Sequence, residues 1–112
     1  IPTAGSGIYA ASKAAMTSLT RTMAAEWAPQ GIRVNGYSAG VIETEMTKPA
    51  IQNNGENMLD AIALHHFGKV DEMVKVVGFL ASEDSEYITG INLDASGGKY
   101  IVQNAGNAWK EK

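Results

Sequence analysis

The strongest constraint on the fold is a helical pattern over residues 8–28 that stops at a proline and is followed at once by a strand pattern. Apolar side chains recur there at steps of three and four residues, namely Ile8, Ala15, Met16, Leu19, Met23 and Trp27. Pro29 ends the pattern, Gly31 makes the turn, and residues 32–38 have the pattern of a strand. A helix joined to a strand by so short a turn is typical of layered α/β folds.

A second helix and a second strand are predicted later in the chain. Residues 70–82 carry an apolar stripe at helical spacing, formed by Val70, Met73, Val74, Val77, Leu80 and Ala81. We expect this stripe to lie in the core. Residues 91–95 alternate as a short strand, and residues 99–112 are expected to form a tail that packs on a neighbour or frays.

Residues 45–68, which lie between the first predicted strand and the second predicted helix, have a less regular pattern. Proline, glycine and asparagine residues interrupt it, so we expect short helical pieces over 45–52 and 56–65 in a mobile segment. Segments of this kind usually carry function or are disordered. The adjacent His65 and His66 point about 100° apart on a helix and have no carboxylate at ligand spacing. A solvated or substrate-facing pair is therefore favoured over a metal site.

A tyrosine and a lysine stand one helical turn apart near the start of the chain. Tyr9 and Lys13 are expected on one face of the first helix. The ammonium group stabilises the phenolate form of a neighbouring tyrosine. A phenol in that setting can exchange a proton with a substrate hydroxyl or carbonyl group. This spacing is also common on ordinary helix surfaces, so its interpretation depends on the residues that follow.

Composition limits the classes of protein that remain. The 112 residues suffice for one small domain, and a net charge of −3 argues against a nucleic-acid-binding surface. The absence of cysteine excludes a disulfide framework and thiolate metal sites. No apolar run approaches the length needed to span a membrane. These features predict a soluble, cytoplasmic protein with no nucleic-acid or membrane partner and no bound metal.

The ordered motifs resemble the carboxyl-terminal half of a short-chain dehydrogenase/reductase. Four signatures carry the resemblance over positions 1 to about 100: Tyr9-Ala-Ala-Ser-Lys13, Gly31-Ile-Arg-Val-Asn35, Ser38-Ala-Gly-Val-Ile-Glu-Thr44, and Phe79-Leu-Ala-Ser82 leading to Thr89-Gly90 and Asp94-Ala-Ser-Gly-Gly98. The resemblance implies an α/β fold, the carboxyl-terminal part of a Rossmann-like doubly wound parallel sheet. Residues 1–112 would then be the carboxyl-terminal half of a single NAD(P)-binding domain.

The resemblance also implies roles for individual residues. Tyr9 matches the family's general acid/base, and Lys13 matches the lysine that assists it and holds the nicotinamide ribose. The cofactor-binding loop corresponds to Ala39, Gly40, Ile42 and Thr44. Ala39 stands where the family usually has proline, which would loosen this loop slightly. Thr44 has an alternative interpretation as the N-cap of the segment after it.

The implied activity is hydride transfer between NAD or NADP and a small-molecule carbonyl or secondary alcohol. The family's phosphate-binding pattern G-x-x-x-G-x-G is not present, and its substrate-polarising serine would precede Ile1. We therefore expect a split or cleaved enzyme with an amino-terminal half as partner, and a homo-oligomer, either dimer or tetramer. Two alternatives stay open. One is an epimerase or dehydratase that uses the same tyrosine and lysine, and the other is a non-catalytic fragment that assembles through the alanine-rich face of residues 8–28.

Overall fold

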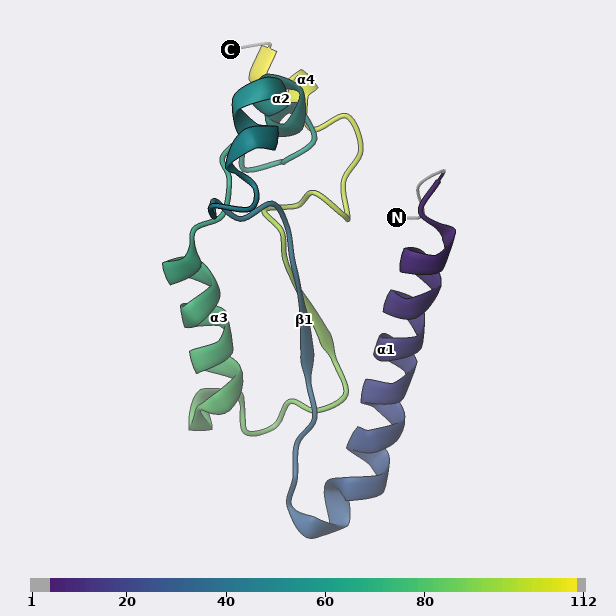
Figure 1. The fold of residues 1–112 in the computed structure, drawn as a ribbon. Helices are drawn as coiled ribbons and strands as arrows, with labels where there is room; N and C mark the ends of the chain where they lie inside the picture. Colours follow the sequence, from purple (N-terminus) through teal and green to yellow (C-terminus); the bar gives the residue numbers. More distant parts are fainter. Residues whose placement is uncertain (1–4, 111–112) are drawn as a thin grey trace. The chain divides into compact units, whose positions relative to one another are not determined.

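The computed structural model describes residues 5–110 and shows the α/β element order expected from the sequence (Figure 1). Residues 1–4, and residues 111–112 at the end of the predicted tail, lie outside the described residues. The elements are α1 (Gly7–Trp27), η1 (Ala28–Gln30), β1 (Gly36–Ala39), α2 (Lys48–Asp60), α3 (Val70–Ala81), η2 (Glu83–Ser85), β2 (Asn92–Ala95) and α4 (Gly106–Lys110). β1 and β2 are neighbours in a two-stranded parallel sheet.

The chain divides into two compact units, each built from two stretches of sequence. Unit 1 consists of Ile1–Tyr37 and Phe79–Leu93, and unit 2 consists of Ser38–Gly78 and Asp94–Lys112. None of the helices within residues 5–110 is long and apolar enough to cross a membrane.

In unit 1, α1 ends where the sequence predicts and packs closely at one point. Gly31 has φ 76° and donates its N–H to the Ala28 carbonyl oxygen at 2.9 Å, which closes η1, the short helical turn that directly follows α1. Ala24 is buried, and a Cβ on Gly90 would lie 3.4 Å from its methyl group. Small residues at this contact allow the backbone of residue 90 to approach the helix.

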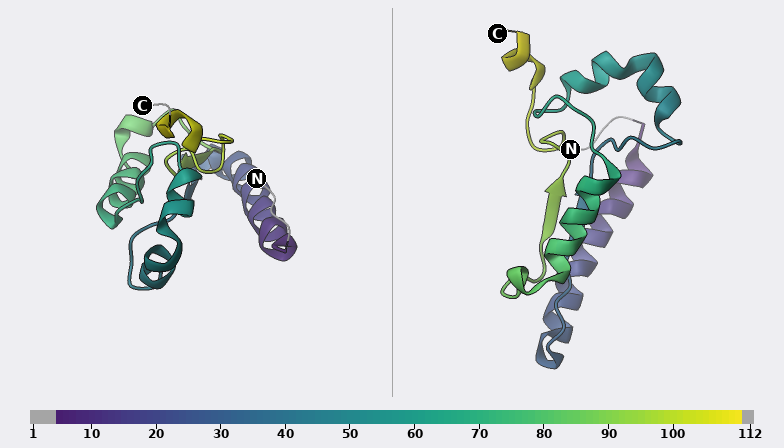
Figure 2. Two further views of the ribbon diagram at one scale, coloured as in Figure 1. Left: turned by 90° about the horizontal axis from the view of Figure 1, so that it is seen from above. Right: turned by 90° about the vertical axis from the view of Figure 1, so that its left-hand side faces the viewer.

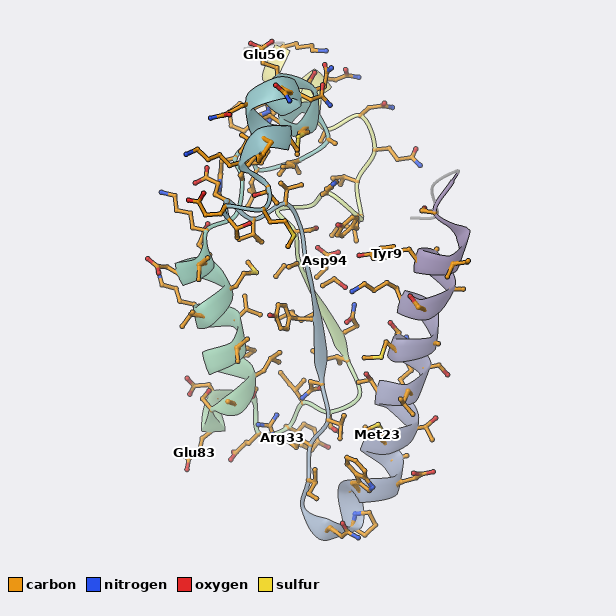
Figure 3. All side chains as sticks on the ribbon, in the orientation of Figure 1. Tyr9, Met23, Arg33, Glu56, Glu83 and Asp94 are labelled. Carbon is orange, nitrogen blue, oxygen red and sulfur yellow. The ribbon has the colours of Figure 1, made fainter. Side chains whose placement is uncertain are left out.

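The strand predicted over residues 32–38 begins only at Gly36. Before it, side-chain hydrogen bonds join a backbone bond from the Gly90 N–H to the Val34 carbonyl at 2.8 Å. The Val34 N–H donates to the Thr89 hydroxyl at 3.0 Å, and the Asn35 amide donates to the Ile88 carbonyl at 3.0 Å. Arg33 donates to the carbonyls of Ile88 and Leu80, each at 3.0 Å. The segment is therefore held in place without regular strand hydrogen bonding. Figure 3 shows Arg33 together with Glu83, which projects outward from η2.

In unit 2, the two helical pieces predicted over 45–52 and 56–65 form one interrupted helix. α2 has a non-helical residue in its middle, Asn54, with φ −142°. Figure 2 shows α2 from two further directions. The prediction of a break is confirmed, but the second piece ends at Asp60, five residues early. Residues 61–66 instead form a turn, and within this turn Ile62 is buried, with 1% of its surface exposed.

The apolar stripe on α3 is not in the core, contrary to the sequence prediction. Val70, Val74 and Val77 are exposed, and no described residue of α3 is buried. The physical reason is the small area of the sheet, which has two strands of four residues each. Such a sheet cannot cover the apolar faces of helices as long as α1 and α3.

Candidate active site

The first group of predicted site residues lies on α1 in unit 1. The Lys13 ammonium nitrogen is 5.4 Å from the centroid of the Tyr9 ring. Tyr9 is 63% exposed, so its hydroxyl is open to a ligand. Figure 3 shows Tyr9 and Met23 projecting from the same side of the helix. The expected proximity of the tyrosine and the lysine is thus present, and their catalytic roles stay a prediction.

The helix that carries this pair is locally regular. The Ser12 hydroxyl donates to the Tyr9 carbonyl at 2.8 Å, and the Thr17 hydroxyl donates to the Lys13 carbonyl at 3.2 Å. Both are side chains bonding back one turn along the helix. The Ser12 hydroxyl is therefore engaged with the helix backbone beside Tyr9.

The second group lies on the loop that follows β1, in unit 2. Ala39 ends the strand, and Gly40 packs against the backbone of Ser96. A Cβ on Gly40 would lie 2.9 Å from the Ser96 Cα, so only glycine fits without movement. Ser96 is itself fixed, because it is buried and both its hydroxyl and its N–H donate to the Asp94 carboxylate.

Ile42 is held by the end of the segment that contains α2. It forms an isolated parallel bridge with Gly68. The Gly68 N–H donates to the Val41 carbonyl and the Glu43 N–H donates to the Gly68 carbonyl, both at 2.9 Å. A Cβ on Gly68 would lie 2.6 Å from Ile42 Cδ1, so the isoleucine side chain occupies the space that glycine leaves. Two separate segments thus fix the backbone of the predicted cofactor loop.

Thr44 is tied to a residue that the sequence reasoning missed. The Thr47 hydroxyl accepts the Thr44 N–H at 2.9 Å and donates to the Ile42 carbonyl. α2 begins at Lys48 with Thr47 at the N-cap position, where the Thr47 side chain makes no capping hydrogen bond. The Thr44 hydroxyl accepts the Thr47 N–H at 3.3 Å, so Thr44 caps the turn that leads into α2, and the helix itself starts later than the sequence predicted. The signal was present in the sequence, because Thr47 directly precedes Lys48-Pro49 and proline is favoured in the first turn of a helix.

A groove of about 340 Å³ opens beside this loop. Its lining includes Gly40, Ile42, His66, Glu72, Lys75 and Ser96. The histidine pair therefore separates. His66 lines the groove, whereas His65 stacks on the Trp109 ring with 4.7 Å between centroids. Over the part of the chain that the structure describes, no group of three or more histidine, aspartate or glutamate side chains is placed to hold a metal ion.

The two groups belong to different units. Tyr9 and Lys13 are in unit 1, and the loop from Ala39 to Thr44 is in unit 2. In unit 1 the phenol and the ammonium are paired on a helix, as the sequence predicted. In unit 2 the glycine-containing loop is fixed by neighbouring segments, which the sequence did not predict.

Comparison with known proteins identifies the family. The family model described as enoyl-(acyl carrier protein) reductase matches residues 1–99. The chain belongs to the short-chain dehydrogenase/reductase family. Among curated members, protein FixR of Bradyrhizobium diazoefficiens is 42% identical over 100 residues, which are 89% of this chain and 34% of that protein. The 3-oxoacyl-[acyl-carrier-protein] reductase FabG of Pseudomonas aeruginosa is 40% identical, over 88% of this chain and 40% of the relative.

Solved short-chain dehydrogenase/reductase structures show the same fold. The enzyme from Brucella melitensis, described as a glucose/ribitol dehydrogenase, aligns with a TM-score of 0.78 and 36% identity over 87% of this chain and 39% of its own. A putative 2-deoxy-D-gluconate 3-dehydrogenase from Agrobacterium tumefaciens with bound NADP aligns with a TM-score of 0.76 and 31% sequence identity, over 84% of this chain and 39% of its own. A 4-hydroxyisoleucine dehydrogenase complexed with NADH aligns with a TM-score of 0.78 and 36% sequence identity, over 85% of this chain and 40% of its own.

These alignments confirm the predicted fold class, the carboxyl-terminal part of a Rossmann-like sheet. The chain spans 34% and 40% of the lengths of the two curated relatives given above. The shared region thus contains the Tyr9–Lys13 helix and the loop after β1.

Proposed function

We propose that this chain is the proton-transfer half of an NAD(P)-dependent oxidoreductase that acts on a carbonyl or secondary alcohol. Active protein would then include an amino-terminal half upstream of residue 1, and we call that molecule the complete polypeptide. The observation that supports this most is the Lys13 ammonium 5.4 Å from the Tyr9 ring, on a helix of a short-chain dehydrogenase/reductase.

The proposed chemistry assigns one task to each side chain. In the reducing direction the Tyr9 hydroxyl donates its proton to the substrate carbonyl oxygen, and in the oxidising direction its phenolate accepts the alcohol proton. Lys13 binds the ribose hydroxyls of the cofactor and stabilises the phenolate. The bound nicotinamide cofactor supplies or accepts the hydride.

The residues present fit one end of such a cofactor. The exposed phenol of Tyr9 and the adjacent Lys13 ammonium offer a donor pair for ribose hydroxyls. The loop from Ala39 to Thr44 offers backbone groups for the nicotinamide carboxamide, and its shape is held by Ser96, Gly68 and Thr47. Phosphate contacts are expected from the amino-terminal half, because this sequence contains no G-x-x-x-G-x-G pattern.

The relatives suggest which compounds to test. One relative is named a 3-oxoacyl-[acyl-carrier-protein] reductase, and solved neighbours are named dehydrogenases of 2-deoxy-D-gluconate and 4-hydroxyisoleucine. We propose a panel of acetoacetyl-CoA with NADH or NADPH, and of 2-deoxy-D-gluconate and 4-hydroxyisoleucine with NAD or NADP. Residues 45–68, which we call the lid segment, are proposed to select among such substrates, because His66 and Gly68 line the groove next to the loop.

A tyrosine-to-phenylalanine substitution tests the proposal in the complete polypeptide. Tyr9→Phe removes the proton donor and is expected to lower turnover by about 10²–10⁴-fold. Tyr87→Phe is the matched control, because Tyr87 is fully exposed in the same unit and is expected to leave turnover unchanged. Near-normal turnover in Tyr9→Phe would remove Tyr9 from the mechanism. Isomerised or dehydrated products without net change in NAD(P)H would favour an epimerase or dehydratase.

Assembly of the enzyme is a second part of the proposal. Ile8, Met16 and Leu19 are exposed on α1, which is an apolar surface available to another chain. We propose a cytoplasmic dimer or tetramer. Sedimentation of the complete polypeptide tests the oligomer. A stable oligomer with no turnover on any panel compound and no dinucleotide binding would favour a non-catalytic assembly role.

A further inference from the structure

The last described residues of the chain have a defined place on the lid segment. The family model matches residues 1–99, so residues 100–110 follow the matched region. α4 contacts α2, and Figure 1 shows these two helices side by side. Both helices belong to unit 2. The tail was expected to pack on a neighbour or fray, whereas residues 99–110 dock on their own chain.

Trp109 makes the most specific contact between the tail and the lid segment. Its indole N–H donates to the Ala63 carbonyl at 2.9 Å. Its ring stacks on His65 with 4.7 Å between centroids and 20° between planes. His65 has φ 58°, a left-handed conformation that is unfavourable for residues other than glycine. Trp109 thus contacts the turn 61–66 both at its backbone and at its strained residue.

Two further contacts flank the tryptophan. Before it, Gly98 comes so close to the turn that a Cβ there would lie 2.7 Å from the Ala63 methyl group. After it, the Lys110 ammonium lies 3.8 Å from the Asp60 carboxylate. Both side chains of this ion pair are exposed to solvent, so the pair alone contributes little to the stability of the contact. The indole contacts are therefore the specific part of the attachment.

The turn that Trp109 holds connects α2 to the proposed cofactor loop. Residues 61–66 directly follow the end of α2 at Asp60 and are separated by one residue from Gly68, which forms the parallel bridge with Ile42. The Leu64 N–H also donates to the Gly97 carbonyl at 3.0 Å, and Leu64 and Gly97 both line the groove beside the loop. A shift of this turn would therefore move one wall of the groove and the end of α2 together.

We propose that Trp109 is a positioning residue for substrate binding, which acts by locking the turn 61–66 and with it the lid segment. This inference rests on the proposed function of the lid segment. Trp109 does not touch the reacting atoms in this scheme. Its loss changes how well the substrate is held, while Tyr9 and Lys13, on α1 in unit 1, keep their chemistry.

The test compares Trp109→Leu, Trp109→Phe and Trp27→Leu in the complete polypeptide. Trp109→Leu removes both the hydrogen bond and the stack, and Trp109→Phe keeps an aromatic ring but not the donor. Trp27 is the control, because it is exposed to a similar degree, 38% against 42%, and lies in unit 1. Two quantities are measured: amide hydrogen exchange over residues 48–66 with NADH or NADPH added, and KM and kcat with the fastest compound of the panel.

Trp109→Leu is expected to speed exchange over residues 48–66 and to raise KM, each by about tenfold, with kcat within about twofold. For Trp109→Phe we expect an exchange rate and a KM between those of Trp109→Leu and those of the unsubstituted protein. Trp27→Leu is expected to leave both quantities unchanged. Unchanged exchange in Trp109→Leu overturns the proposal whatever the activity, and so does faster exchange with unchanged KM. Because exchange needs no turnover, an inactive protein would contradict the proposed function without obscuring this result.

Discussion

The helix that carries Tyr9 and the turns around Gly40 differ in how fully this chain covers them. On α1 in unit 1, Ile8 is 90% exposed and Tyr9 is 63% exposed. In unit 2, Ile62 is 1% exposed, and Gly40 and Gly68 are in close contact with Ser96 and Ile42. The loop is therefore shaped by residues of its own chain. The first turn of α1, by contrast, presents Tyr9 on a surface that the described residues of this chain leave uncovered.

This difference separates two kinds of functional residue. Tyr9 and Lys13 need only a regular helix to stand together, and a helix places them one turn apart without tertiary contacts. The loop from Ala39 to Thr44 has no such local rule and depends on Ser96, Gly68 and Thr47. Changes to packing should accordingly affect the loop more than the geometry of the tyrosine–lysine pair.

The largest effect on stability is expected from the buried isoleucine of the turn after α2. In the complete polypeptide, Ile62→Ala leaves a cavity and is expected to lower the free energy of unfolding by about 2–5 kcal/mol. Ile101→Ala is the matched control in the same unit, because Ile101 is exposed and its loss is expected to change stability by about 0.5 kcal/mol or less. Urea unfolding followed by circular dichroism measures both. Equal losses would contradict the view that unit 2 packs around this turn.

A smaller effect is expected where the cofactor loop meets Ser96. Gly40→Ala forces a Cβ to within 2.9 Å of the Ser96 Cα and is expected to cost about 1–3 kcal/mol, together with weaker binding of NADH or NADPH. Gly78→Ala is the control, because nothing lies within 4 Å of a Cβ there and alanine favours the helix by up to about 1 kcal/mol. Thermal unfolding and dinucleotide titration distinguish the two. A Gly40→Ala protein as stable as Gly78→Ala would show that the loop does not depend on this contact.

The smallest effect is expected from the hydroxyl group that joins Thr47 to the loop. Thr47→Val keeps the shape of the side chain but loses the bonds to the Thr44 N–H and the Ile42 carbonyl, at a cost of about 1 kcal/mol. Thr47→Ser keeps the hydroxyl and should restore most of that loss. Titration with NADH or NADPH measures the dinucleotide affinity of both variants. We expect binding to be about fivefold weaker in Thr47→Val and nearly unchanged in Thr47→Ser. Equal binding by both variants would show that the Thr47 hydroxyl does not position the cofactor loop.

The helices and the motif pair could be predicted because their signals are local. The spacing of apolar residues, together with Pro29 and Gly31, predicted α1 to within a residue or two, and the pattern over 70–82 predicted α3 equally well. Tyr9 and Lys13 then followed from helical geometry. The family resemblance, carried by four ordered motifs, gave the fold that the solved relatives confirm.

The parts that could not be predicted depend on contacts distant in sequence. The α3 stripe is exposed rather than buried because burial requires a covering surface, which a periodic pattern does not specify. The close packing of Gly40 on the backbone of Ser96 joins two segments that are far apart in the sequence. The docking of Trp109 on Ala63 joins residues 46 positions apart, and no spacing rule predicts that contact. Sequence periodicity thus predicts elements better than it predicts their neighbours.

Dinucleotide binding by residues 1–112 alone, compared with the complete polypeptide, tests the central claim most directly. That claim is that this chain supplies the phenol, the ammonium and the loop, and that an amino-terminal half supplies the phosphate contacts. Isothermal titration with NADH and with NADPH is expected to show binding by the complete polypeptide and none by residues 1–112. Cooperative unfolding of residues 1–112 together with dinucleotide binding of equal affinity would contradict the account.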